Sequence, residues 1–91
     1  MSWTDDILKE ETKRSPEFLR GFLEEKQKLD IAAAMTHLRE SEGLTQQQLA
    51  DKVGKPQSTI ARIETGKMLP SFRLINEIAA ALDKEVELSF K

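Results

Sequence analysis

The feature that most constrains the fold of this chain is the start of a helix within Leu44–Leu49. Thr45 and Gln48 have the spacing of a capping box, in which each side chain binds the backbone N–H group of the other residue. The two leucines occupy the positions of a hydrophobic staple. Gly54 follows soon after, and glycine suits the left-handed turn that ends a helix. We therefore predict a short helix between Thr45 and Gly54.

A second short helix is predicted over residues 56–65, with Ile60 and Ile63 directed inward and Gly66 ending it. Ser71, after a proline, then starts a further helix with one apolar face. Two short helices joined by a glycine turn have the form of a helix-turn-helix, whose second helix enters the major groove of DNA.

The outward face of the second helix carries side chains that can recognise bases. Because the two isoleucines point inward, the opposite face holds Gln57, Ser58 and Arg62. Gln can make a bidentate contact with adenine, and Arg can make one with guanine. We expect direct base contacts from these residues, with help from Thr59.

Phosphate contacts are expected from three donors around this helix. Gln46 lies at the N-terminus of the first short helix, where its amide and the free backbone N–H groups can hold a phosphate. Lys55 lies in the turn, and Lys67 lies just after the second helix. An ordinary helical hairpin with solvated charges is the alternative, but it does not explain the glycine turn, the inward isoleucines and the polar face together.

Charge is distributed unevenly along the chain. The formal charge is -3 over residues 1–43, +3 over residues 44–73 and -2 over residues 74–91. A basic middle between acidic ends indicates that one segment meets phosphate while the ends meet another partner, such as a basic protein.

The composition argues against an enzyme. The chain has no cysteine and a single histidine, His37, which is too little for a metal cluster or a Ser-His-Asp relay. We expect no catalytic residue, no metal and no cofactor, and we interpret His37 as a surface residue of a helix. No apolar run approaches the roughly 18 residues of a membrane span, and the N-terminus lacks signal-peptide features, so a cytoplasmic protein without membrane contact is expected.

The first 43 residues contain signals for three helix starts. Thr4 can cap a short helix that ends near Lys13, and Ser15 followed by proline offers a second start. Asp30 can cap a third helix over residues 31–42. Residues 16–42 form either two helices or one long helix bent near Leu29.

The C-terminal residues change period. Residues 85–91 alternate polar and apolar side chains, which predicts a strand with one buried face. A lone strand leaves its backbone groups unpaired, so we expect pairing with the dimer mate or with another protein. A frayed tail is the alternative.

The stretch 44–82 resembles the Cro/C1 (XRE-type) repressor family. The resemblance is carried by Leu-Thr-Gln-Gln-Gln-Leu-Ala-Asp-Lys-Val-Gly, by Ala-Arg-Ile-Glu-Thr-Gly-Lys and by Ala-Ala-Ala-Leu. With the helix at 31–42 it covers slightly over half of the chain. It implies an all-α, five-helix domain of the lambda-repressor type that binds DNA. It also implies phosphate contact by Gln46 and base contact by Gln57, Ser58 and Arg62.

Two further implications concern how the domain is held together. Arg39 and Glu64 match an ion pair that ties the first helix of the family domain to the recognition helix, so we expect a structural role for both. Pro56 departs from the Ser or Thr that often caps the recognition helix, which leaves the start of this helix and the role of Lys55 open.

We divide the chain into a partner-binding helical extension over residues 1–28, a helix-turn-helix domain over 29–83 and a strand over 84–91. The stretch Phe18-Leu-Arg-Gly-Phe-Leu-Glu-Glu before an XRE domain resembles the HigA antitoxins of HigBA-type (type II) toxin-antitoxin pairs. Such antitoxins bind a small basic, RelE-like RNA-cleaving toxin and repress the shared promoter.

The resulting expectation is a repressor that binds a palindromic double-stranded DNA operator as a homodimer and neutralises such a toxin. A stand-alone homodimeric repressor is the alternative, followed by a protein-binding adaptor that does not touch DNA. Contacts with the partner or the dimer mate are expected from the apolar residues outside the central domain, which are Trp3, Ile7, Leu8, Phe18, Phe22, Val86, Leu88 and Phe90. The five N-terminal residues of this set could instead extend the core.

Overall fold

The computed structural model describes residues 16–90. The helix expected near residues 4–13 lies outside the described residues, as do Trp3, Ile7 and Leu8. Within the described part, the helices are α2 (Pro16–Ser41), α3 (Gln46–Val53), α4 (Gln57–Glu64) and α5 (Phe72–Ala81). None of these helices is long and apolar enough to cross a membrane.

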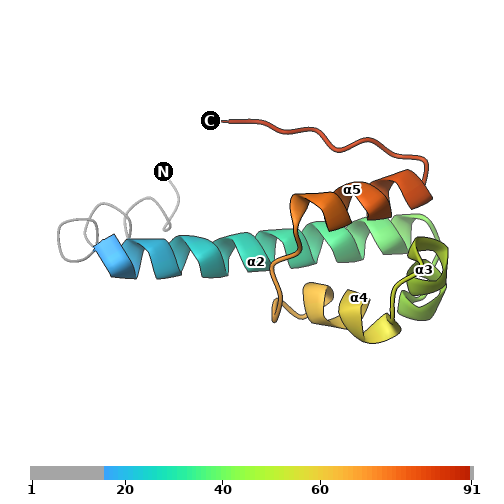
Figure 1. Cartoon of the computed structure of the whole chain (residues 1–91), viewed down its shortest axis with the longest axis horizontal. Coiled ribbons are helices and arrows are strands. Elements are labelled where there is room, and N and C mark those ends of the chain that lie inside the picture. Colours follow the sequence, from blue (N-terminus) through green and yellow to red (C-terminus); the bar gives the residue numbers. More distant parts are fainter. Residues whose placement is uncertain (1–15, 91) are drawn as a thin grey trace.

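α2 is one continuous helix of 26 residues, which decides between the two alternatives left open for residues 16–42. Asp30 does not cap a new helix, because it lies in the interior of α2; its carboxylate accepts a hydrogen bond of 2.7 Å from Lys26 one turn earlier. Figure 1 shows that α3, α4 and α5 pack along the C-terminal half of α2, while its N-terminal half extends beyond them. α2 therefore consists of a packed half and a projecting half.

The core lies between the packed half of α2 and the three short helices. Its largest side chains have no solvent exposure and come from α3, α4 and α5: Leu49, Ile60, Ile63 and Ile78. α2 contributes Met35, which is 6% exposed. Burying a side chain of this size stabilises a protein by about 1.5 to 3 kcal/mol, so these residues hold α4 against the rest of the domain.

The ends of α3 were predicted correctly, because the signals that set them are local. The Thr45 hydroxyl accepts a hydrogen bond of 3.1 Å from the backbone of Gln48, whose side chain accepts one of 2.8 Å from the backbone of Thr45. Gly54 ends the helix in the left-handed conformation, with φ of 73°. α3 and α4 are thereby joined by a tight turn, as a helix-turn-helix requires.

The start of α4 shows what replaces the missing Ser or Thr cap. Pro56 is the N-cap residue, with an extended backbone and no side-chain hydrogen bond. Its carbonyl oxygen accepts the N–H of Thr59 at 3.0 Å. Because proline has no N–H and a fixed φ, it sets the direction of the chain into the helix without a polar cap. α4 begins at Gln57.

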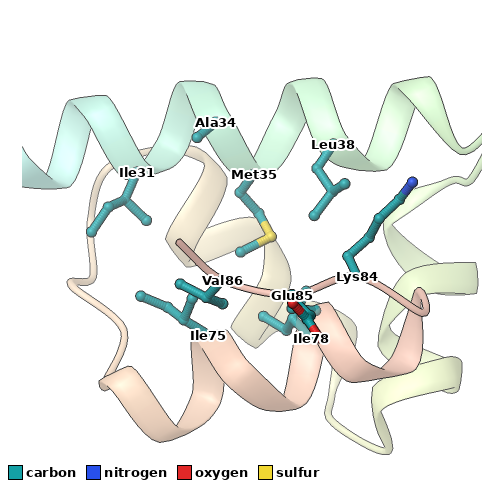
Figure 2. Close-up of a pocket in the computed structure, with 10 residues that line it drawn as sticks. Ile31, Ala34, Met35, Leu38, Ile75, Ile78, Lys84, Glu85 and Val86 are labelled. Carbon is teal, nitrogen blue, oxygen red and sulfur yellow. The ribbon is translucent and has the colours of Figure 1, made fainter. Parts of the chain in front are cut away.

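The expected C-terminal strand is wrong, because residues 84–90 form no strand and no ladder of backbone hydrogen bonds in the described part of the chain. Alternation predicts which side chains share a face, but a strand also needs a second strand beside it. Residues 84–86 instead line an apolar groove of about 310 Å³, together with residues of α2 and α5 (Figure 2). Val86 lies there beside Ile75 and Ile78.

The expected five-helix domain is also wrong, since the described residues contain four helices. α5 ends at Ala81, and the next residues turn sharply, with Asp83 in the left-handed region at φ of 57°. The following residues alternate between polar and apolar side chains, so they lack the 3.6-residue period that a further amphipathic helix needs.

Candidate nucleic-acid interface

The rotation of α4 about its axis is set by its two buried isoleucines. Ile60 and Ile63 have no solvent exposure, and their side chains pack among those of the core. Ser58 and Arg62 consequently lie on the opposite face, and both are exposed. Gln57 lies at the edge of this face and is half-buried. The outward face of α4 therefore presents a hydroxyl, a guanidinium and an amide.

Gln57 is joined to α3 through Gln46. The Nε2 atom of Gln57 donates a hydrogen bond of 2.8 Å to Oε1 of Gln46. The Nε2 atom of Gln46 in turn donates one of 3.1 Å to Oε1 of Glu64, at the C-terminal end of α4. These three side chains form a continuous series of hydrogen bonds between the two helices of the motif.

Arg39 of α2 completes this series. Its Nε and Nη2 atoms donate hydrogen bonds of 2.8 and 3.0 Å to the two carboxylate oxygens of Glu64, which is the bidentate geometry of a strong ion pair. Its Nη1 atom donates one of 2.7 Å to the carbonyl oxygen of Leu44, just before α3. One guanidinium thus joins α2, the start of α3 and the end of α4. We call Arg39, Glu64, Gln46 and Gln57 the α3 flank.

The ion pair changes the titration of both partners. Burial of Glu64 favours its neutral form, but the hydrogen bonds from Arg39 and Gln46 outweigh this, so the pKa of Glu64 lies below its ordinary value. The hydrogen bond to Glu64 raises the pKa of Arg39. The Glu64 side chain is only 4% exposed, so water screens the pair weakly. Glu64 is therefore charged at neutral pH.

Thr59 and Lys55 lie on the other side of α4, away from Gln57. Both line a shallow depression next to α5, together with Arg73 and Glu77. The Lys55 ammonium is 3.4 Å from the Glu77 carboxylate, and the Arg73 guanidinium is 3.6 Å from it. We call Lys55, Arg73 and Glu77 the α5 flank. The structure therefore brings Lys55 to an acidic side chain rather than to Gln46.

Lys67 follows α4 in a turn shaped by Gly66. Gly66 is left-handed, with φ of 74°, and a Cβ atom there would lie 3.3 Å from the side chain of Leu29. The Lys67 N–H donates a hydrogen bond of 3.0 Å to the Arg62 carbonyl oxygen, and the Lys67 side chain is exposed. The turn thus holds a lysine beside the end of the outward face.

The apolar residues expected to contact a partner occupy two separate segments. Phe18 and Phe22 lie on the projecting half of α2, with their rings stacked at a centroid distance of 6.3 Å. At the other terminus, Val86 lines the groove of Figure 2, while Leu88 and Phe90 are 69% and 89% exposed. Val86 therefore lies beside the core residues of the groove, while Phe18, Leu88 and Phe90 are exposed.

Sequence reasoning missed the contacts of Gln46 with Gln57 and Glu64, and the contact of Lys55 with Glu77. These pairs are separated by 11, 18 and 22 residues, so no helical spacing relates them. The sequence contains one signal for the contacts of Gln46: Gln57 and Glu64 are both polar and lie at one edge of the α4 surface. In the structure this edge faces the N-terminus of α3.

The comparisons with known proteins place the chain in a family. The HTH_3 helix-turn-helix family, which is of the Cro/C1 (XRE) type, matches residues 37–88, and the chain belongs to it. Membership in this family implies DNA binding. No solved structure matches the chain significantly.

Two relatives are named uncharacterized HTH-type transcriptional regulators. The protein from Methanothermobacter thermautotrophicus is 45% identical over 47 residues, which are 52% of this chain and 68% of that protein. The protein from Archaeoglobus fulgidus is 44% identical over 45 residues, which are 50% of this chain and 64% of that protein. The similarity therefore spans about half of this chain and about two thirds of each relative.

Proposed function

We propose that the chain is a sequence-specific DNA-binding transcriptional repressor that inserts α4 into the major groove. The observation that carries the proposal is the outward face of α4, on which Ser58 and Arg62 are exposed and Gln57 is held by Gln46. These are the side-chain types that bond to base edges. Gln46 at the N-terminus of α3 and Lys67 after α4 flank this face and serve as phosphate contacts.

Lys55 is a phosphate contact of a different kind within this proposal. Its side chain is 39% exposed and its ammonium lies beside the Glu77 carboxylate, so the ammonium must leave this carboxylate to meet DNA. Exposed ion pairs of this kind contribute at most about 1 kcal/mol, so a phosphate can displace the carboxylate. Thr59, on the same side of α4, assists at the edge of the interface.

Within this proposal, the repressor acts as a homodimer on a palindromic operator. One recognition helix reads only a few base pairs, and dimers of this motif read two half-sites about 34 Å apart or a multiple of that. The segment of Val86, Leu88 and Phe90, with two strongly exposed apolar side chains, is the part of the domain end available for contact with a dimer mate or another partner.

Selection from a random double-stranded DNA library tests the proposal. The wild-type protein should enrich a palindrome, and Arg62→Ala should relax the preference at one base pair in each half-site. Enrichment of no sequence, with no shift of DNA mobility even at low salt, would exclude the repressor function and favour a protein-binding adaptor.

We further propose that the repressor is the antitoxin of a HigBA-type pair. Support comes from the projecting half of α2, where Phe18 and Leu23 are 46% and 38% exposed although the core of the domain lies elsewhere. Exposed apolar side chains of this kind suit a protein partner. The formal charge of -3 over residues 1–43 suits a basic one.

Co-expression with the adjacent reading frame tests the antitoxin role. A small basic product of that frame should co-purify with this chain and should arrest growth when expressed without it. A stand-alone repressor predicts neither result. Phe18→Asp and Leu23→Asp should abolish co-purification while leaving DNA binding intact, whereas unchanged co-purification would exclude the projecting half as the contact.

A further inference from the structure

The orientation of the Gln57 side-chain amide is set by the hydrogen bonds that the Glu64 carboxylate accepts in the α3 flank. The Glu64 carboxylate can only accept hydrogen bonds, and it receives two from Arg39 and one from Gln46. Gln46 must therefore turn its NH2 group toward Glu64. Its carbonyl oxygen then faces Gln57, which can approach it only with an N–H group.

This bond removes one of the two N–H donors of Gln57. The Nε2 atom of Gln57 gives one hydrogen to Oε1 of Gln46 at 2.8 Å. What remains for a ligand is one N–H group and the Oε1 atom, so Gln57 presents one donor and one acceptor. With a free Gln side chain, the amide could rotate and offer both hydrogens.

The remaining pair of groups matches adenine and not guanine. In the major groove, adenine presents the N7 acceptor and the N6 amino donor, which one donor and one acceptor satisfy together. Guanine presents two acceptors, O6 and N7, and needs two donors. One of those donors is already bound to Gln46.

We propose that Glu64 is a positioning residue that gives Gln57 its preference for adenine over guanine. Glu64 acts through Gln46, whose amide it holds in one sense, and it does not touch the base itself. The inference rests on the proposed function, because it requires that Gln57 reads a base. It assigns to the Arg39–Glu64 pair a role in specificity beyond holding the helices together.

The test compares base preferences of wild-type protein and Glu64→Gln. The operator selected by the wild-type protein is first compared with the operator selected by Gln57→Ala. The base pair at which Gln57→Ala loses its preference is the one that Gln57 reads. Binding constants are then measured for duplexes with A·T or G·C at this position. Wild type should prefer adenine about tenfold or more, the discrimination of one bidentate contact. Glu64→Gln should reduce the ratio to about threefold or less, because a neutral amide lets Gln46 turn over.

The controls separate specificity from folding and from charge. The preference at the base pair read by Arg62 should be unchanged in Glu64→Gln. Glu24→Gln removes one negative charge from the exposed projecting half of α2 and should keep the full adenine preference. If Glu64→Gln does not fold by circular dichroism, Gln46→Met decides, because it frees Gln57 while leaving Arg39 paired with Glu64.

The outcomes distinguish the inference from the function on which it rests. A wild-type adenine preference that persists in folded Glu64→Gln, or in Gln46→Met, overturns the inference alone. A wild-type protein that selects no DNA sequence overturns the proposed function, and the inference with it. If Glu64→Gln weakens binding to both duplexes by the same factor, the role of Glu64 is purely structural. This result also overturns the inference.

Discussion

Charged side chains form ion pairs on two sides of α4, and these pairs differ in burial and geometry. On the α3 flank, Glu64 is 4% exposed and its hydrogen bonds are 2.8 to 3.1 Å long. On the α5 flank, Glu77 is 39% exposed and its ion pairs are 3.4 and 3.6 Å long, one of them to an Arg73 side chain that is 91% exposed. One side is a buried network and the other is a pair of solvated contacts.

The difference in burial determines which of the two sets of ion pairs can fix the positions of the neighbouring side chains. A buried, bidentate pair is costly to break, because removal of one partner leaves an uncompensated charge in a poorly hydrated place. Exposed pairs are screened by water and salt and contribute little. The α3 flank therefore holds the outward face of α4 in place, and the α5 flank leaves Lys55 able to exchange its partner.

The largest expected effect is on folding. Arg39→Leu should lower the free energy of unfolding by about 3 kcal/mol, because Glu64 would stay buried without its counter-charge. Urea denaturation followed by circular dichroism measures this change. The matched control is Arg73→Leu on the exposed flank, which should change the value by less than about 0.5 kcal/mol. Equal losses of unfolding free energy in the two variants would show that the two flanks do not differ in their contribution to stability.

The next effect concerns DNA binding by the face between the two flanks. Arg62→Ala should cost about 1 to 3 kcal/mol and relax preference at one base pair. Lys55→Ala should instead weaken binding to all sequences similarly and reduce the slope of log affinity against log salt by about 1. Mobility-shift titrations at several salt concentrations measure both. An unchanged slope for Lys55→Ala would mean that its pair with Glu77 persists on DNA.

A smaller effect follows from the titration of Glu64. Its pKa is lower in the folded protein than in the unfolded chain, so its contribution to stability is complete above the unfolded value of about 4.3 and is lost as the pH falls through the lowered folded value. Unfolding free energies measured below pH 4.3 should therefore fall more steeply in wild type than in Glu64→Gln. Parallel curves would show that this ion pair plays no part in acid unfolding.

The smallest effect is expected from Glu77→Gln. Stability should stay within about 0.5 kcal/mol of wild type, because the contacts of Glu77 are exposed. Affinity for DNA of any sequence should rise slightly at low salt, because Lys55 no longer has a competing carboxylate. Weaker non-specific binding in this variant would show that Glu77 holds Lys55 in a productive position.

Local signals in the sequence predicted the helices of the motif, while the hydrogen bonds of Gln46 with Gln57 and Glu64, which are distant in the sequence, could not be predicted from it. The capping box at Thr45, the glycine at residue 54 and the serine at residue 71 set helix ends through neighbouring atoms, and the structure has α3, α4 and α5 at those places. The series from Arg39 to Gln57 depends on how three helices pack, so no single segment contains it.

The two errors of fold have the same physical origin. Residues 85–91 do alternate between polar and apolar side chains, but a strand exists only beside a partner strand, and Val86 instead lines a groove between α2 and α5. The family resemblance implied a fifth helix in the domain that the described residues do not contain. At residue 30 the chain continues α2, and Asp30 pairs with Lys26 one turn earlier.

Because α2 is one continuous helix, a tilt of one of its ends displaces the other end. A helix of 26 residues is about 39 Å long, and a tilt of about 5° at one end moves the other end by about 3 Å. Arg39, near one end, is bonded to the recognition helix, and Phe18 lies near the other end, outside the core. A ligand that tilts the far end of α2 would therefore displace Arg39 relative to Glu64 at the C-terminal end of α4.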